Sequence, residues 1–230
     1  MKLAIMQPYF FPYIGYFQLI KSVDKFVFYD DVNFIKNGWI NRNRVLINGK
    51  PSYFTVTLNG ASPFMLIKDV LFSDNRNKLL KTLENTYKKA PFYDDTINAL
   101  KPVFLLETTY ISDLAIESVK SVSKYLGIQT IFEKSSETYS DSKGMEKSAR
   151  LKQICHQNNA TVYHNPIGGT ELYFKDDFAK SDIELKFINT DNIIYKQFKN
   201  EFVPNLSIID LMMFNSKEQI QKFLDCYSLI

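Results

Sequence analysis

The chain has 230 residues, of which 45% are hydrophobic, 15% aromatic and 23% charged. This composition excludes a disordered chain, because disorder requires low hydrophobicity together with high net charge. The net charge is only +3. A protein that binds nucleic acid usually concentrates many more lysines and arginines on one face, so we do not expect nucleic acid as the main partner.

Metal sites and membrane segments are also not expected. The two cysteines, Cys155 and Cys226, lie far apart, and the chain has only two histidines, so the spacing of a structural zinc site is missing. Gln7 and two prolines interrupt the apolar run at the N-terminus, which argues against a signal peptide. No apolar stretch is long enough to cross a membrane. We therefore expect a cytoplasmic protein that does not insert into a membrane.

The first thirty residues predict a strand, a helix and a second strand. Residues 3–6 and 26–29 are short apolar runs typical of buried strands, and residues 17–23 between them favour a helix. Such a unit makes a parallel pair, and parallel sheets bind ligands at the carboxyl ends of their strands. Residues 7–12 and 29–31 occupy those ends, so we expect a pocket there.

The rest of the chain continues an α/β pattern. Residues 44–58 predict a hairpin, because Asn48-Gly49 is a strong turn signal. Residues 75–125 are helical in pattern, with breaks at Pro91 and Pro102, and Gly127 follows as a helix cap. Further elements are expected in this order: a strand at 66–71, a strand at 130–132, a polar loop at 135–144, a helix at 147–158, strands at 161–164, 183–188 and 193–197, and helices at 208–215 and 217–225.

We interpret this pattern as one α/β domain over residues 1–230. It has a mainly parallel, Rossmann-like sheet, a β-hairpin excursion and a helical insert at about 75–125.

The loop after the first predicted strand is the most unusual part of the sequence. It packs aromatic residues, two prolines and a glycine where α/β proteins bind ligands. The candidate binding residues in this loop are Gln7, Tyr9, Tyr13, Gly15 and Tyr16. The alternative is a surface loop whose aromatic side chains fill the core.

Within this loop, Tyr13-Ile14-Gly15-Tyr16 resembles the His-x-Gly-His motif of nucleotidylyltransferases and class I tRNA synthetases. The glycine is in place, but both histidines are tyrosines. A helix start after a glycine can still bind an anion through its N–H groups. Chance similarity is the alternative, since the match spans four residues.

Two further groups follow the second predicted strand. Asp30 and Asp31 are candidate catalytic residues, because paired carboxylates can have their pKa values pushed apart so that one acts as a base. An exposed turn at the strand end is the alternative. The second group contains donors around the only tryptophan, which suits phosphate binding and stacking on a base or sugar: Lys36, Trp39, Asn41, Arg42 and Arg44. A solvated hairpin entrance would explain the same residues.

The C-terminal half offers fewer candidates. His164 is expected at the end of a strand and is the better of the two histidines as a catalytic base. Gly168-Gly169 follows it and could admit a phosphate or thioester, or form a turn. Tyr195 and Gln197 would alternate on one face of a strand and line the same pocket. Ser207 is expected to cap a helix.

Several of these stretches together resemble the WbqC-like family. The resemblance rests on residues 6–17, 26–32 and 35–44, and on later stretches at 167–173, 195–197 and 204–210 in the same order. The family name comes from O-antigen gene clusters. The resemblance implies a transferase that adds an acyl or aminoacyl group to the amine of a nucleotide-linked amino sugar in surface-polysaccharide synthesis.

In that reading, Asp30, Asp31 or His164 accepts a proton, and the other candidates bind the substrates. No cofactor is expected to be tightly bound. The co-substrate would be an acyl thioester of coenzyme A or of an acyl carrier protein, or an aminoacyl-tRNA, and the sequence leaves this choice open. The high aromatic content also favours a homodimer contact. Two other functions stay open: nucleotidyl transfer or adenylation through the degenerate glycine motif, and a non-catalytic protein that binds a sugar nucleotide.

Overall fold

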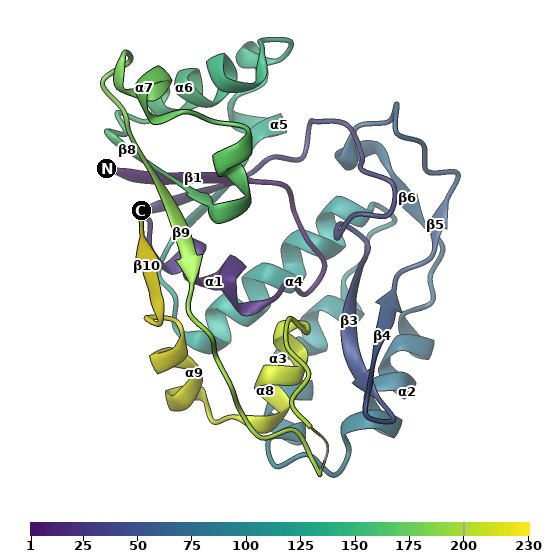
Figure 1. Cartoon of the computed structure of the whole chain (residues 1–230). Coiled ribbons are helices and arrows are strands. Elements are labelled where there is room, and N and C mark those ends of the chain that lie inside the picture. Colours follow the sequence, from purple (N-terminus) through teal and green to yellow (C-terminus); the bar gives the residue numbers. More distant parts are fainter. Residues whose placement is uncertain (200) are drawn as a thin grey trace.

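A mainly parallel sheet forms the centre of the protein. Figure 1 shows the computed structural model, which describes residues 1–199 and 201–230. Within these residues six strands pair in the order β10-β9-β8-β1-β2-β7. Their bounds are β1 Lys2–Met6, β2 Lys25–Phe28, β7 Ile131–Lys134, β8 Val162–Pro166, β9 Glu184–Thr190 and β10 Tyr227–Leu229. Only β10 is antiparallel to its neighbour. The predicted α/β class with a mainly parallel sheet is confirmed.

The chain adds strands to the sheet on both sides of β1. It passes first through helix α1 (Ile14–Lys21) to β2 and later to β7, and it then returns to the other side of β1 for β8 and β9. The crevice beyond the carboxyl ends of β1 and β8 therefore lies where the connections diverge, which is the usual ligand position in such sheets.

Side chains alternate across the sheet and bury both of its faces. In β1, Ala4 packs into one hydrophobic cluster, and Leu3 and Ile5 pack into another. Helices α6 (Lys147–Gln157) and α7 (Lys175–Ala179) cover the Leu3 and Ile5 face, and α1 and α4 (Ile111–Leu126) cover the other (Figure 1). Among the described residues, no helix has both the length and the apolar character needed to cross a membrane.

The remaining elements extend the cluster on the α1 side. The hairpin of β3 (Arg42–Ile47) and β4 (Lys50–Thr55) turns at Asn48 and Gly49, whose φ angles of 51° and 73° suit the predicted Asn-Gly turn. Helices and short strands complete this side: β5 Leu58–Asn59, β6 Leu71–Phe72, α2 Arg76–Tyr87, α3 Tyr93–Leu105, α8 Ile208–Phe214 and α9 Lys217–Phe223. Gly127 caps α4 in the left-handed conformation, with φ 75°, and Ser207 caps α8, as the sequence predicted.

Four predictions about elements are wrong. The stretch 135–144, expected to be a loop, contains the short helix α5 (Ser135–Thr138) and a 3-10 turn, Ser140–Ser142. Pro102 lies inside α3 rather than ending it, in the last turn, where the lost N–H removes a single hydrogen bond. Residues 66–71 form a 3-10 turn, Ile67–Asp69, before the short β6. Residues 193–197 are not a strand; the Tyr195 and Gln197 side chains donate to Asp210 of helix α8.

Candidate functional site

The loop between β1 and α1 is held from several sides. Phe11 has a φ of 43°, a left-handed conformation that is costly for a bulky residue. Its N–H donates to the Ser118 hydroxyl at 3.0 Å, and the Ser207 hydroxyl donates to its carbonyl at 2.7 Å. The Phe10 N–H donates to the Trp39 carbonyl at 3.1 Å. Phe10 and Phe11 are fully buried, so these two side chains fill the core, and the contacts fix the loop's shape.

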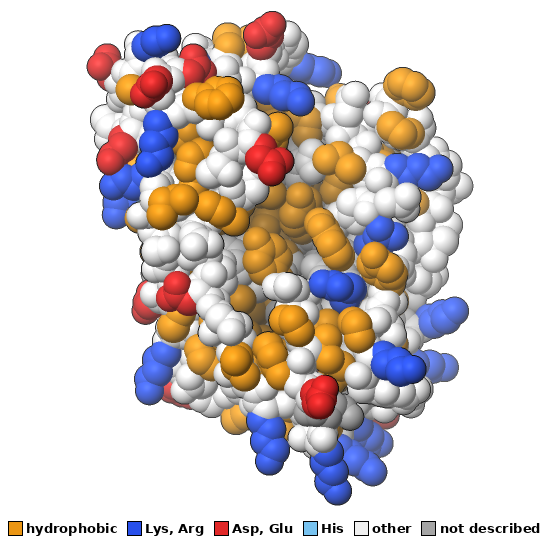
Figure 2. Space-filling model, in the orientation of Figure 1, with side chains coloured by type: hydrophobic (Ala, Val, Ile, Leu, Met, Phe, Trp, Pro, Cys, Tyr) orange, Lys and Arg blue, Asp and Glu red, His pale blue; other side chains and the backbone are white. Residues whose placement is uncertain are grey.

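A small cavity opens beside this rigid loop. Its volume is about 250 Å³, and six residues line it: Tyr9, Tyr13, Trp39, Asn43, Arg44 and Asn205. Figure 2 shows one face of the molecule, where hydrophobic side chains gather in a central hollow between the α6–α7 side and the β3–β6 side. Ligand sites of this kind combine apolar walls with a few polar groups.

The polar groups in the cavity are mainly donors. The Arg44 guanidinium lies 5.9 Å from the centre of the Trp39 ring, and one terminal nitrogen donates to the Asn205 carbonyl at 3.1 Å. Among the described residues, Arg44 has no carboxylate within ion-pair distance. Burial, with a smaller effect of Tyr13, raises the pKa of Tyr9 to about 12, so this hydroxyl stays protonated. The cavity thus suits a planar ring attached to an anionic group.

Three of the residues predicted around the tryptophan do not line this cavity. Arg42 donates to the carbonyls of Asn37 and Gly38 and lies over the Tyr53 ring at 4.4 Å. It therefore holds the preceding loop to the hairpin. Asn41 is buried and donates to the Val56 carbonyl at 2.9 Å, and Lys36 is exposed. Of the predicted group, Trp39 and Arg44 are the two that the structure brings to the cavity.

Gly15 is explained by packing. A Cβ at this position would lie 2.4 Å from the Tyr13 ring and 2.6 Å from the Thr190 hydroxyl at the end of β9. The missing side chain thus lets α1 approach β9, and no open space for a phosphate remains over it. Tyr16 is buried and donates to the Gln7 carbonyl at 2.8 Å, which closes the loop on itself.

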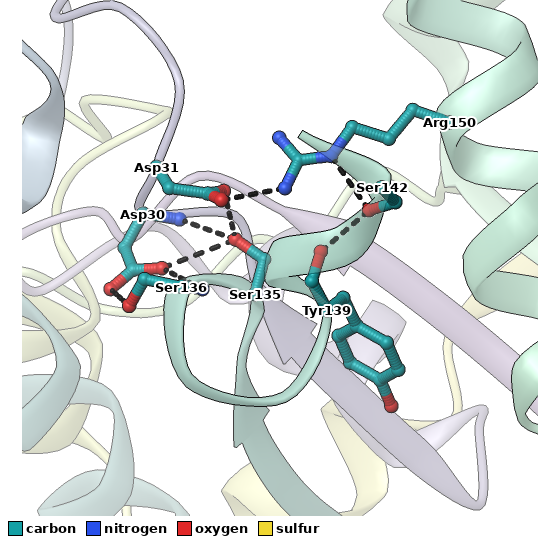
Figure 3. A network of polar contacts seen from close by, with 7 residues as sticks. All are labelled: Asp30, Asp31, Ser135, Ser136, Tyr139, Ser142 and Arg150. Atoms are coloured by element: carbon teal, nitrogen blue, oxygen red, sulfur yellow. Dashed lines mark hydrogen bonds and ion pairs between the residues drawn. The ribbon is translucent and has the colours of Figure 1, made fainter. Parts of the chain in front are cut away.

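Asp30 and Asp31 form a buried network with the start of helix α5 (Ser135–Thr138), directly after β7 (Figure 3). Asp30 accepts from the Ser136 hydroxyl at 2.7 Å and from the Ser136 N–H at 3.0 Å. Asp31 accepts from the Ser135 hydroxyl and forms an ion pair with Arg150 of α6 at 2.6 Å. The two carboxylates therefore join the carboxyl ends of β2 and β7 to the helix layer above.

Arg150 is itself fully engaged in this network. Its Nε donates to the Ser142 hydroxyl at 3.1 Å, and its guanidinium lies 4.8 Å from the centre of the Tyr29 ring. The Asp31 and Arg150 side chains are only 2% and 4% exposed. Since these acids are buried and bonded, they hold the sheet edge in place and do not face the cavity.

His164 lies away from the carboxyl edge. Strand β8 continues for two residues beyond it, and it pairs with Ala4 in the middle of the sheet. Its Nδ1 is 2.8 Å from the Ser22 hydroxyl. Burial lowers the pKa of His164 to about 4, with smaller effects from Lys2 and Lys186. The structure therefore does not bring this histidine to the other candidate residues.

The two glycines after β8 differ. A Cβ at Gly169 would lie 2.1 Å from the Asn165 side-chain oxygen, so this glycine is required by packing. Gly168 has nothing within 4 Å of its Cβ position and is exposed. Only Gly168 leaves room for a ligand to approach the backbone.

Tyr195 and Gln197 meet at a buried carboxylate. Both donate to the same Asp210 oxygen, at 2.7 and 2.8 Å, and Tyr87 donates to the other oxygen at 2.7 Å. Burial raises the pKa of Asp210, partly offset by these donors. Gln197 also accepts from the Val203 N–H at 2.7 Å. This cluster attaches the segment that leads to the cavity residue Asn205 to helix α8.

A larger hollow, of about 810 Å³, lies at the opposite edge of the sheet, near the start of β2 and β7. Two of its charged residues, Lys21 and Asp225, form an ion pair, and the Thr130 hydroxyl donates to the Ile20 carbonyl at 2.7 Å. It also lies at the amino ends of the strands, where parallel sheets seldom bind ligands. We therefore place the candidate site at the smaller cavity. Among the described residues, no cluster of three His, Cys, Asp or Glu side chains could hold a metal ion.

Sequence reasoning missed residues in both places. Asn43 and Asn205 line the cavity, and Ser135, Ser136 and Arg150 complete the network around the acids. The serines follow a predicted strand end and could have been found from that position. Asn43, Asn205 and Arg150 carry no such signal, because each meets its neighbours only through segments that are distant in the sequence.

Comparison with known proteins identifies the family of this chain. The model of the WbqC-like protein family matches residues 7–222. The chain belongs to the WbqC-like protein family. It is also similar to the uncharacterized protein Rv1507c of Mycobacterium tuberculosis, with 31% identity over 216 residues that cover 92% of each chain. No solved structure was found to match the chain.

Proposed function

We propose that this chain is a transferase that adds an acyl or aminoacyl group to the amine of a nucleotide-linked amino sugar in surface-polysaccharide synthesis. The observation that carries the proposal is the cavity itself. It combines the rings of Tyr9, Tyr13 and Trp39 with Arg44, an arginine that no carboxylate neutralises among the described residues. Aromatic rings stack on a base or sugar, and an arginine binds a phosphate.

The cavity holds one part of such a ligand. A volume of about 250 Å³ is below the usual range for a whole small-molecule site, about 300 to 1,000 Å³. The rest of the ligand and the acyl donor therefore lie in the hydrophobic hollow beside it (Figure 2). The donor is a thioester of coenzyme A or of a carrier protein, or an aminoacyl-tRNA.

The reaction needs no separate oxidant or metal. The neutral amine attacks the acyl carbon, the N–C bond forms, the bond to the leaving sulfur or oxygen breaks, and the leaving group takes the proton. Holding two reactants in line can by itself supply a large part of the rate. Asp31 and Asp30 contribute by fixing the sheet edge, since their buried carboxylates are already bonded.

A second candidate is a protein that binds a sugar nucleotide without catalysis. None of the six residues that line the cavity is a carboxylate or an imidazole, which favours this reading. The proposal of nucleotidyl transfer depended on Gly15 as a phosphate-binding glycine. Packing against Tyr13 and Thr190 explains this glycine without a phosphate.

The test is to incubate the protein with UDP- or dTDP-amino sugars and an acyl-coenzyme A, and to detect the N-acylated product by mass spectrometry. Arg44→Gln should reduce both binding and product. Lys50→Gln removes the same charge from an exposed position on the same hairpin and should change neither. Binding without product for any donor class would support the binding protein. Failure to bind any nucleotide sugar would contradict both functions.

A further inference from the structure

Asn43 is a buried residue whose side-chain oxygen is hydrogen-bonded within the protein and whose side-chain nitrogen is not. The residue is 4% exposed and lines the cavity. Its side-chain oxygen accepts from the Arg44 backbone N–H at 2.8 Å. Because the backbone N–H is a donor, the amide oxygen must face it and the amide nitrogen must point the other way. The amide nitrogen has no partner among the described residues. The amide nitrogen is therefore available to donate to a ligand in the cavity that this residue lines.

Arg44, the next residue along β3, also lines the cavity. Its Nε is buried and has no hydrogen-bond partner in the described part of the chain. The other arginines near this edge differ, since Arg42 bonds to two backbone carbonyls and Arg150 to a serine and an aspartate. The cavity is therefore lined by an amide nitrogen without a protein partner and by an arginine that lacks a carboxylate partner, on consecutive residues of the described chain.

We infer that Asn43 and Arg44 bind an anionic group of the ligand that has only acceptor oxygens, a phosphoryl or carboxylate group, and that Asn43 determines this specificity. This inference rests on the proposed function and deepens it. An ammonium group is disfavoured in this cavity, because Arg44 already places a positive charge there that no carboxylate offsets among the described residues. The reacting amine of the sugar consequently lies outside, toward the hydrophobic hollow, while the anionic part is anchored.

The test compares Asn43→Asp with Asn48→Asp by isothermal titration calorimetry. The first change keeps the oxygen that accepts from the Arg44 N–H, but it replaces the open donor by a negative acceptor. The second places the same charge on the exposed turn of the same hairpin. The probes are UDP, pyrophosphate, glucuronate and uridine.

We expect the wild type to bind UDP or glucuronate and to bind uridine much more weakly. Asn43→Asp should weaken binding of the anion roughly tenfold or more, and Asn48→Asp should not change it. Binding of UDP and pyrophosphate identifies a phosphoryl group, and binding of glucuronate a carboxylate. Equal affinity of Asn43→Asp and the wild type for the anion would overturn the inference, as would a wild type that binds no anionic probe.

A folded state is checked by thermal unfolding of each variant. If Asn43→Asp does not fold, the same titration is done with Asn43→Ser. The serine hydroxyl can still accept from the Arg44 N–H but does not reach the ligand as the amide does, so binding of the anion should again be weaker. Two different outcomes distinguish failure of the inference from failure of the proposed function. Nucleotide-sugar binding that Asn43 variants leave unchanged overturns only the inference. Loss of binding in those variants, with no product formed by the wild type, overturns only the transferase.

Discussion

Removing Arg150 should leave a buried negative charge without its partner. We consider Arg150→Met, which keeps the length of the apolar side chain and removes the guanidinium. The Asp31 side chain is 2% exposed and its closest charged contact is Arg150, at 2.6 Å. Breaking a buried pair from one side costs about 3 to 5 kcal/mol of unfolding free energy. Loss of the contact over the Tyr29 ring adds about 0.5 to 2 kcal/mol.

Lys152→Met is the matched control. It removes a cation from the same helix, where Lys152 forms an ion pair with Asp177 at 2.9 Å, but the Asp177 side chain is 41% exposed. Exposed pairs contribute about 0 to 1 kcal/mol, so this variant should remain close to the wild type. The double variant Asp31→Asn/Arg150→Met removes both charges and should regain much of the lost stability.

Urea denaturation followed by circular dichroism measures these differences as changes in the unfolding free energy at constant slope. The reasoning would be refuted if Arg150→Met stayed within about 1 kcal/mol of the wild type. It would also be refuted if the double variant were no more stable than the single one, since the cost would then not come from an unpaired charge.

The remaining predictions use the same assay. Gly15→Ala should lose about 1 to 3 kcal/mol because its methyl group meets two side chains, and Gly168→Ala should change stability by less than about 0.5 kcal/mol; equal effects would contradict the packing role. The folded pKa of His164 is about 4, below the usual value of about 6.5, so the native state binds fewer protons than the unfolded state between these pH values. Stability should therefore fall by up to about 3 kcal/mol as the pH is lowered through this window, since one pKa unit corresponds to about 1.4 kcal/mol. His164→Gln should flatten that dependence; an unchanged slope would argue against a buried neutral imidazole. Tyr195→Phe removes a donor from the buried Asp210 carboxylate and should cost about 1 to 3 kcal/mol, whereas a neutral result would mean that water replaces the hydroxyl.

Some features of this protein are local, and the sequence by itself determined them. Apolar runs marked the central strands, because a strand buried on both faces needs no polar residues. Asn48-Gly49 specified the hairpin turn and Gly127 the end of α4, because both depend on positive φ angles that few other residues adopt. The aromatic loop after β1 was also recognisable, since its position follows from the parallel sheet.

The tertiary structure decided what those local features do. Asn43 and Asn205 meet in one cavity although 162 positions separate them, and Asp31 meets Arg150 across 119 positions. The sequence predicted His164 at a strand end, but β8 continues for two more residues because β9 pairs with Asn165 and Pro166. Which donors stay open to a ligand depends on partners that distant segments supply, and no local pattern encodes those partners.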